Sequence, residues 1–153
     1  MTGDAKKRIL FVCIGNACRS QMAEAFARHY GSDVVIPASA GLAPASRVAP
    51  DTIRAMREKN IDLREHFPKT LRQLARVPFD AVVNMSGAPL PEDLKVPIEE
   101  WEVADPVSMD YKKHCQVRDE IEQRVMKMLL NLRRAQPQSR SRLRGQGSGR
   151  LPV

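Results

Sequence analysis

A cysteine and an arginine bracket a short loop near the start of the 153-residue chain. The loop lies between an apolar run and a helical pattern, and it reads Val12-Cys13-Ile14-Gly15-Asn16-Ala17-Cys18-Arg19-Ser20. Its backbone N–H groups can surround one tetrahedral oxyanion, because the next helix begins where that anion would lie. Cys13 would then lie beneath the anion as a nucleophile, and the Arg19 guanidinium would reach the outer oxygens. The spacing predicts a phosphate-binding loop made of Ile14, Gly15, Asn16, Ala17, Cys18, Arg19 and Ser20.

The surroundings of Cys13 are expected to favour its thiolate. A helix N-terminus and a nearby cation such as Arg19 both stabilise a sulfur anion. Ser20 can donate a hydrogen bond to the sulfur. Gly15 allows close approach of the backbone, and Asn16 tolerates the left-handed conformation of a tight loop.

Attack by Cys13 on a phosphoester also needs an acid for the leaving oxygen and later a base for water. Asp105 is the predicted residue, because it follows the last predicted strand and Pro106 stiffens the loop that presents it. Asp110 and Asp119 are alternatives, although Asp119 falls inside a helical pattern.

Cys18 has two interpretations that the sequence leaves open. It is either a packed core thiol or a redox partner that protects or switches Cys13. The three histidines, His29, His66 and His114, lack the spacing of metal ligands, so no metal site is expected.

The elements that must position these residues alternate between strands and helices. Short apolar runs predict strands at residues 8–12, 33–38, 79–85 and 99–103. Helical spacing predicts helices at residues 18–30, 50–60, 70–76 and 111–134. This alternation predicts an α/β fold, a three-layer sandwich with a four-stranded parallel sheet and helices on both faces. Ligands bind beyond the carboxyl ends of such strands, where Cys13 and Asp105 are both expected.

The charge divides the chain into a domain at residues 8–134 and a basic tail at residues 135–153. The tail has no acidic residue and four arginines, which are Arg140, Arg142, Arg144 and Arg150. Removing these four charges from the formal +7 leaves +3, which is ordinary for a domain. The domain has no basic helix with interleaved rings, so a nucleic-acid partner is not expected. The tail is predicted to be solvated and disordered.

The location is expected to be the cytoplasm. No stretch approaches the length of a membrane span, so no membrane partner is expected. The polar start of the chain lacks the shape of a signal peptide. Three cysteines, with one directly after a strand, fit free thiols in a reducing compartment. The oligomeric state is left open.

The chain resembles the low-molecular-weight protein tyrosine phosphatase family and the related thiol-coupled arsenate reductases. The resemblance runs from about residue 8 to residue 132, and it rests on the Cys13 loop, on Ser39-Ala40-Gly41 and on Asp105-Pro106. It implies a four-stranded parallel sheet and no metal or organic cofactor. It also implies roles for individual residues: Cys13 as nucleophile, Arg19 on the oxyanion, Asn16 and Ser20 supporting the loop, and Asp105 as acid.

The resemblance points to two branches. Gln21-Met22-Ala23-Glu24-Ala25 and Ser46-Arg47-Val48-Ala49-Pro50 are similar to the reductases, which also use a cysteine after the third strand. The segment Asn84-Met85-Ser86-Gly87-Ala88-Pro89 has none, so Cys18 or an external thiol would have to replace it. Phosphatases of the family often carry aromatic residues after Asp-Pro and after Ser-Ala-Gly. Here those positions read Val107-Ser108-Met109 and Leu42-Ala43-Pro44.

Three hypotheses follow. The main one is a cysteine-dependent phosphomonoester hydrolase of the phosphotyrosine type with a phosphocysteine intermediate, acting on a phosphorylated small molecule or a phosphotyrosine protein. The second is an arsenate reductase that uses Cys13 with Cys18 or an external thiol donor. The third is a non-catalytic regulatory module that binds an oxyanion.

Overall fold

The computed structural model describes residues 5–136 of the chain. Four strands form one sheet in the order β2-β1-β3-β4, and every neighbouring pair is parallel. The strands are β1 Lys7–Cys13, β2 Val35–Gly41, β3 Ala81–Asn84 and β4 Ile98–Glu100. The helices are α1 Arg19–Gly31, α2 Pro50–Arg57 and α3 Tyr111–Arg134, with a short 3-10 helix, η2, at Arg72–Leu74. The predicted α/β fold with a four-stranded parallel sheet is confirmed.

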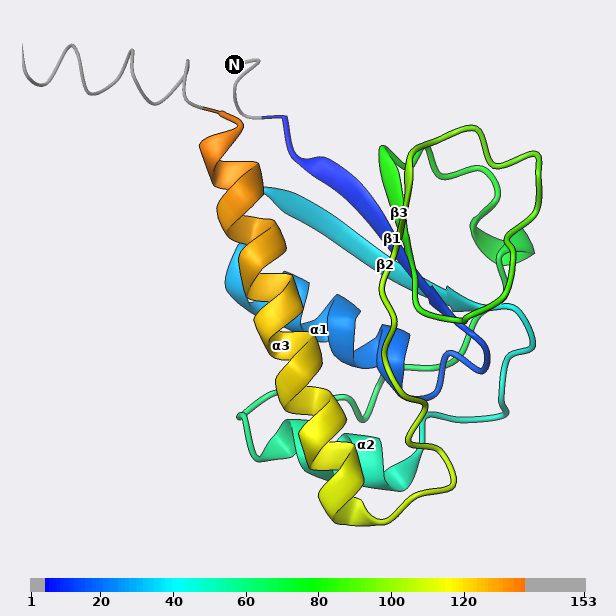
Figure 1. Cartoon of the computed structure of the whole chain (residues 1–153), viewed down its shortest axis with the longest axis vertical. Helices are drawn as coiled ribbons and strands as arrows, with labels where there is room; N and C mark the ends of the chain where they lie inside the picture. The colour runs from blue at the N-terminus through cyan, green and yellow to red at the C-terminus, as the bar shows by residue number, and fades with distance from the viewer. Residues whose placement is uncertain (1–4, 137–153) are drawn as a thin grey trace, which may run out of the picture.

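The helices form two outer layers of unequal thickness (Figure 1). Helices α1 and α3 pack on one face of the sheet and share with it the larger buried cluster of apolar side chains. On the other face, Leu71 and Leu74 of the η2 region pack against Leu10 and Val82 of the strands. The third layer is therefore thin, because a single turn of 3-10 helix and the loops around it cover that face.

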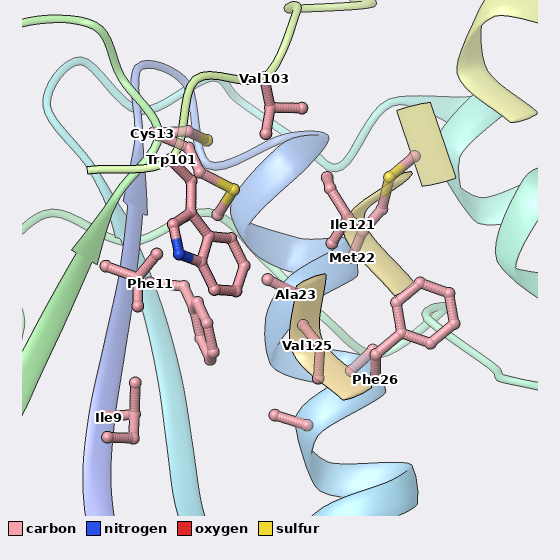
Figure 2. Close-up of a cluster of buried hydrophobic side chains, with 14 of the residues drawn as sticks. Ile9, Phe11, Cys13, Met22, Ala23, Phe26, Trp101, Val103, Ile121 and Val125 are labelled. Carbon is pink, nitrogen blue, oxygen red and sulfur yellow. The ribbon is translucent and has the colours of Figure 1, made fainter. Parts of the chain in front are cut away.

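Strand β1 lies in the middle of the sheet and ends at the phosphate-binding loop. Side chains alternate along a strand, so Ile9, Phe11 and Cys13 face α1 while Leu10 and Val12 face the other layer. Figure 2 shows this first row, with Cys13 at the end where the strand enters the loop. The Cys13 side chain is thus an extension of the buried core.

The last strand is shorter than predicted. The pattern predicted residues 99–103, whereas β4 ends at Glu100. Trp101 and Val103 are still buried on one side, and the Trp101 ring lies 6.0 Å from that of Phe11. The Trp101 N–H still donates to the Asn84 carbonyl of β3 over 2.9 Å, and two residues later the Val103 carbonyl accepts a hydrogen bond from Arg19.

Two predicted helices are also shorter in the structure. Helix α2 ends at Arg57 rather than at residue 60, because Asn60 adopts a left-handed φ of 62° that α-helix cannot continue. The helix predicted at residues 70–76 is only the single turn of η2.

The C-terminal end of α3 lies far from the Cys13 loop. Arg133 bonds Asp33, which precedes β2, and Figure 1 shows this end beside the start of β1. The tail predicted to be disordered lies almost wholly outside the described residues. Among residues 5–136, no helix is both long enough and apolar enough to span a membrane.

Candidate active site

The sulfur of Cys13 is surrounded by hydrogen-bonding groups of its own loop. The backbone N–H of Asn16 donates to the sulfur over 3.2 Å, and the Ser20 hydroxyl lies 2.9 Å away. The Asn16 side chain donates to the same hydroxyl over 2.7 Å. Asn16 has a φ of 50°, a left-handed conformation of the kind that asparagine tolerates. The structure therefore brings together Cys13, Asn16 and Ser20, and these contacts stabilise a sulfur that carries negative charge.

A second set of polar side chains supports Asn16 from outside the loop. The Gln21 amide donates to both the carbonyl and the side-chain oxygen of Asn16, each over 3.1 Å. Gln21 in turn lies 2.9 Å from a ring nitrogen of His66, and the Lys69 backbone donates to Asn16 over 2.9 Å. Sequence reasoning missed Gln21 and His66. The only signal was a polar residue at position 21 next to apolar residues in the predicted helix, and the Gln21 side chain is fully buried in the structure.

The loop between β2 and α2 orients the phosphate-binding loop. Its backbone N–H groups donate to the carbonyls of Cys13, Ile14, Gly15 and Ala17 over 2.8–3.1 Å. These bonds fix the peptide planes of the phosphate-binding loop. The two loops approach closely at Gly41, where an added Cβ would lie 2.7 Å from the Ile14 carbonyl oxygen. The glycine of Ser39-Ala40-Gly41 is therefore needed for this approach.

The Arg19 guanidinium is buried and held by two parts of the chain. One terminal nitrogen donates to the carbonyls of Met85, after β3, and Val103, after β4. The other lies 3.3 Å from the Asp105 carboxylate. Arg19 Nε is buried with no hydrogen-bond partner among the described residues. An unpaired buried donor is unfavourable, so this N–H is suited to receive an oxygen of an anion above the loop.

Asp105 lies at the mouth of a pocket of about 210 Å³ that includes Cys13 and Arg19. Its side chain is 41% exposed, and it accepts a hydrogen bond from the Val107 backbone over 3.1 Å. The next residue, Pro106, is buried and anchors this loop. The carboxylate can therefore reach both an entering substrate and water.

The two alternative acids have other partners and do not line this pocket. Asp110 accepts a hydrogen bond from the Lys113 backbone over 2.9 Å and so caps α3. Asp119 pairs with Arg118 at 2.8 Å. Of the three aspartates considered, Asp105 is the one that lies with Cys13.

Cys18 lines the same pocket as a buried free thiol. Burial raises the pKa of this thiol to about 11, although a hydrogen bond with Thr52 opposes the shift. Thr52 also lies 3.4 Å from a ring nitrogen of the buried His114. At neutral pH, Cys18 is therefore a protonated thiol beside Cys13.

The rest of the pocket wall is apolar and small. It is formed by Ile14, Gly15, Ala17, Ala45 and Val107, with no aromatic ring among the lining residues. Within the described part of the chain, no group of three or more His, Cys, Asp or Glu side chains could hold a metal ion. The arrangement offers a nucleophilic sulfur, a guanidinium and a carboxylate to one small oxyanion.

Comparison with known proteins agrees with this geometry. The family model described as low molecular weight phosphotyrosine protein phosphatase matches residues 8–138. The glutaredoxin arsenate reductase of Synechocystis is 32% identical over 130 residues, which cover 82% of this chain and 98% of that protein.

Two solved structures have the same fold. An arsenate reductase in a phosphate-binding state superposes with a TM-score of 0.75 at 28% identity, over 82% of this chain and 98% of the other. The YwlE arginine phosphatase of Geobacillus stearothermophilus superposes with a TM-score of 0.76 at 26% identity, over 86% of this chain and 96% of the other. Both reductases and phosphatases therefore share this fold and sheet. The chain belongs to the low molecular weight phosphotyrosine protein phosphatase family, in which it is similar to the arsenate reductase branch.

Proposed function

We propose that the protein hydrolyses phosphomonoesters through a phosphocysteine intermediate on Cys13. The observation that carries this proposal is the Arg19 guanidinium. It is fixed by two carbonyls, yet it presents a buried, unpaired Nε in the part of the chain that the structure describes. A tetrahedral phosphoryl group on Cys13 would supply the missing oxygen acceptor.

In the first step, Cys13 Sγ attacks phosphorus and the bond from phosphorus to the ester oxygen breaks. Asp105, in its protonated form, gives its proton to the leaving oxygen. Arg19 and the loop amides bear the charge of the three equatorial oxygens, which is the largest contribution expected in phosphoryl transfer.

In the second step, water attacks the phosphocysteine and Asp105 takes a proton from that water. The bond between sulfur and phosphorus breaks, and inorganic phosphate leaves. The departing thiolate is stabilised by the hydrogen bonds from Asn16 and Ser20. This chemistry needs a reduced Cys13, which fits a protein of the cytoplasm.

The proposed substrates are phosphorylated small molecules or phosphotyrosine proteins. The family description supports the phosphotyrosine class. The pocket wall is made of small apolar side chains, so it gives apolar contact without stacking an aromatic ring. We therefore expect weak selection between aryl and alkyl phosphates.

The test is hydrolysis of p-nitrophenyl phosphate and phosphotyrosine peptide by the purified chain. Cys13→Ser should lower kcat at least about 10³-fold, because the weak hydroxyl replaces the thiolate nucleophile. Asp105→Asn should lower the hydrolysis of a peptide ester about 10²-fold, since proton transfer is lost. Asp93→Asn, at an exposed residue that does not line the pocket, is the matched control for Asp105→Asn and should leave both rates unchanged. Wild-type rates in Cys13→Ser would refute the proposal.

A second candidate is arsenate reduction, which is favoured by the named relatives. Cys13 would displace one arsenate oxygen as water and form a bond from sulfur to arsenic. A second thiol would then attack the Cys13 sulfur, giving a disulfide and releasing arsenite, so that two thiols are oxidised and arsenic is reduced. The high pKa of Cys18 makes it a slow attacking group, so an external thiol such as glutathione is the better donor.

Arsenate-dependent oxidation of glutathione, with or without glutaredoxin, tests this second function. Turnover that survives Cys18→Ser and is lost in Cys13→Ser would support a reductase with an external thiol. Turnover that requires Cys18 would assign it the redox role. A lack of arsenate-dependent thiol oxidation with every donor would exclude the reductase.

A further inference from the structure

A tyrosine at the first residue of α3 ties that helix to the end of α2. The Tyr111 hydroxyl donates a hydrogen bond to the carboxylate of Glu58, which is the C-cap residue of α2. The guanidinium of Arg54 lies 3.7 Å from the centroid of the Tyr111 ring. Arg118 of α3 donates to the same Glu58 carboxylate over 3.0 Å. We call Tyr111, Glu58, Arg54 and Arg118 the α2–α3 latch.

The charges within this latch support one another. Hydrogen bonds from Tyr111 and Arg118 hold the pKa of Glu58 below its usual value. The carboxylate is therefore ionised at neutral pH and remains a full acceptor for both donors. Arg54 over the ring adds a cation–π contact, so Tyr111 is held by its hydroxyl and by its face.

The two helices joined by the latch each follow a loop that forms part of the pocket. Helix α2 follows the loop that contains Ala45, which is itself hydrogen-bonded to the Gly15 carbonyl over 2.9 Å. Helix α3 follows the loop of residues 104–110, which we call the acid loop and which carries Asp105 and Val107. Ala45 and Val107 both line the pocket. The latch therefore joins the two pocket-forming loops through the helices behind them.

The acid loop is anchored unevenly. Its first half is held by the buried Pro106 and by the contact of Asp105 with Arg19. Residues 107–110 are exposed, and their internal support is a turn from Met109 to the Pro106 carbonyl and the Asp110 cap. Tyr111 is the first residue after this exposed stretch that bonds to another element.

We propose that Tyr111 is a positioning residue, which acts through the α2–α3 latch to hold the acid loop and hence the Asp105 carboxylate over the pocket. The proposal rests on the proposed phosphatase function. Asp105 is needed to protonate a poor leaving group, but a nitrophenolate leaves without a proton. Loss of the latch should therefore affect esters according to their leaving groups, which a general loss of stability would not do.

The test compares Tyr111→Phe, which keeps the ring but removes the hydroxyl, with Tyr30→Phe as a matched control. Tyr30 also bonds a glutamate, Glu122, over 2.7 Å, but this pair joins α1 and α3 away from the pocket. Tyr111→Phe should lower kcat/KM for phenyl phosphate about fivefold and change that for p-nitrophenyl phosphate less than about twofold. The control should leave the ratio of the two substrates unchanged. An equal fall in kcat/KM for both substrates, or no fall for either, would overturn the proposal.

Hydrogen exchange of the backbone gives a readout that does not depend on activity. Tyr111→Phe should speed exchange in the acid loop, whereas Tyr30→Phe should leave the exchange of that loop at the wild-type rate. If the wild-type chain hydrolyses no phosphomonoester, the proposed function fails, and exchange alone decides whether the latch holds the loop. Unchanged exchange of the acid loop in Tyr111→Phe would then refute the latch.

Discussion

At the scale of single residues, Arg19 has three tasks that one side chain performs together. One terminal nitrogen donates to the carbonyls of Met85 and Val103, and so it holds the segments that follow β3 and β4. The other faces Asp105, while Nε is buried without a partner among the described residues and is the group that we propose binds the ligand. A planar guanidinium can point donors in these directions at once, whereas an ammonium is a point charge.

Replacement of Arg19 by lysine should therefore remove function without removing charge. We expect Arg19→Lys to lower kcat/KM for p-nitrophenyl phosphate by about 10²-fold or more, because donors to the transition-state oxygens are lost. Arg28→Lys, in the same helix, is the control: this half-exposed arginine pairs with the buried Glu24 and does not line the pocket, so the variant should stay within about twofold of wild type. Similar activity in Arg19→Lys and wild type would mean that charge alone suffices.

At the scale of elements, the phosphate-binding loop depends on a segment far away in the sequence. Asn16 is held in its left-handed conformation by Gln21 and by the Lys69 backbone, and Gln21 is held by His66. The sequence could single out Asn16 and Ser20 as candidate supports of the loop, because the loop is local and its chemistry is set by neighbouring residues. It could not find His66, because a contact across 45 residues depends on how the loops fold together.

Burial lowers the pKa of His66 below its usual value, which makes this support sensitive to pH. His66 therefore binds a proton less tightly in the folded chain than in the unfolded chain, where the pKa of a histidine is about 6.5. The stability that neutral His66 contributes is present above that pH and is lost as the pH falls toward the folded value. Thermal melts at about pH 7.5 and about pH 5 should show a larger drop in Tm for wild type than for His66→Asn.

The matched control for this pH dependence is His29→Asn, at an exposed position of α1. It should show the wild-type drop in Tm between the two pH values. The same drop in His66→Asn would show that His66 contributes nothing to the acid sensitivity.

At the scale of the whole molecule, the long helix α3 joins the parts that build the site. It packs on α1, and its N-terminal end lies beside α2, as Figure 1 shows. The sequence predicted this helix almost to the residue, because its apolar stripe repeats over many turns. It predicted β4 less well, because the alternating burial of Trp101 and Val103 continues past Glu100, where the strand ends, and burial alone does not mark the end of a strand.

Loosening the packing of α3 should therefore destabilise the entire fold. Leu129 is fully buried, and it packs so closely on α1 that its Cδ2 would lie 2.3 Å from a Cβ at Gly31. Leu129→Ala should lower the free energy of unfolding by about 2–5 kcal/mol, through lost burial and the cavity that remains. Leu130→Ala, at a side chain 46% exposed, should change it by less than about 0.5 kcal/mol.

Urea denaturation measures both variants. Equal stability of Leu129→Ala and Leu130→Ala would contradict the assignment of α3 to the core.

The central claim is that Cys13 carries the phosphoryl group during turnover, and rapid quenching followed by peptide mass spectrometry tests it most directly. Asp105→Asn should be mixed with p-nitrophenyl phosphate, because this ester forms the phosphocysteine without help from an acid. The same variant lacks the base that activates water, so the hydrolysis of the phosphocysteine should be slow. The Cys18→Ser form of the same variant separates the two cysteines of the loop. We predict that Cys13 carries the phosphoryl group, at about one phosphoryl group per enzyme molecule. Product release with no phosphoryl group on Cys13, or with the group on another residue, would contradict the account.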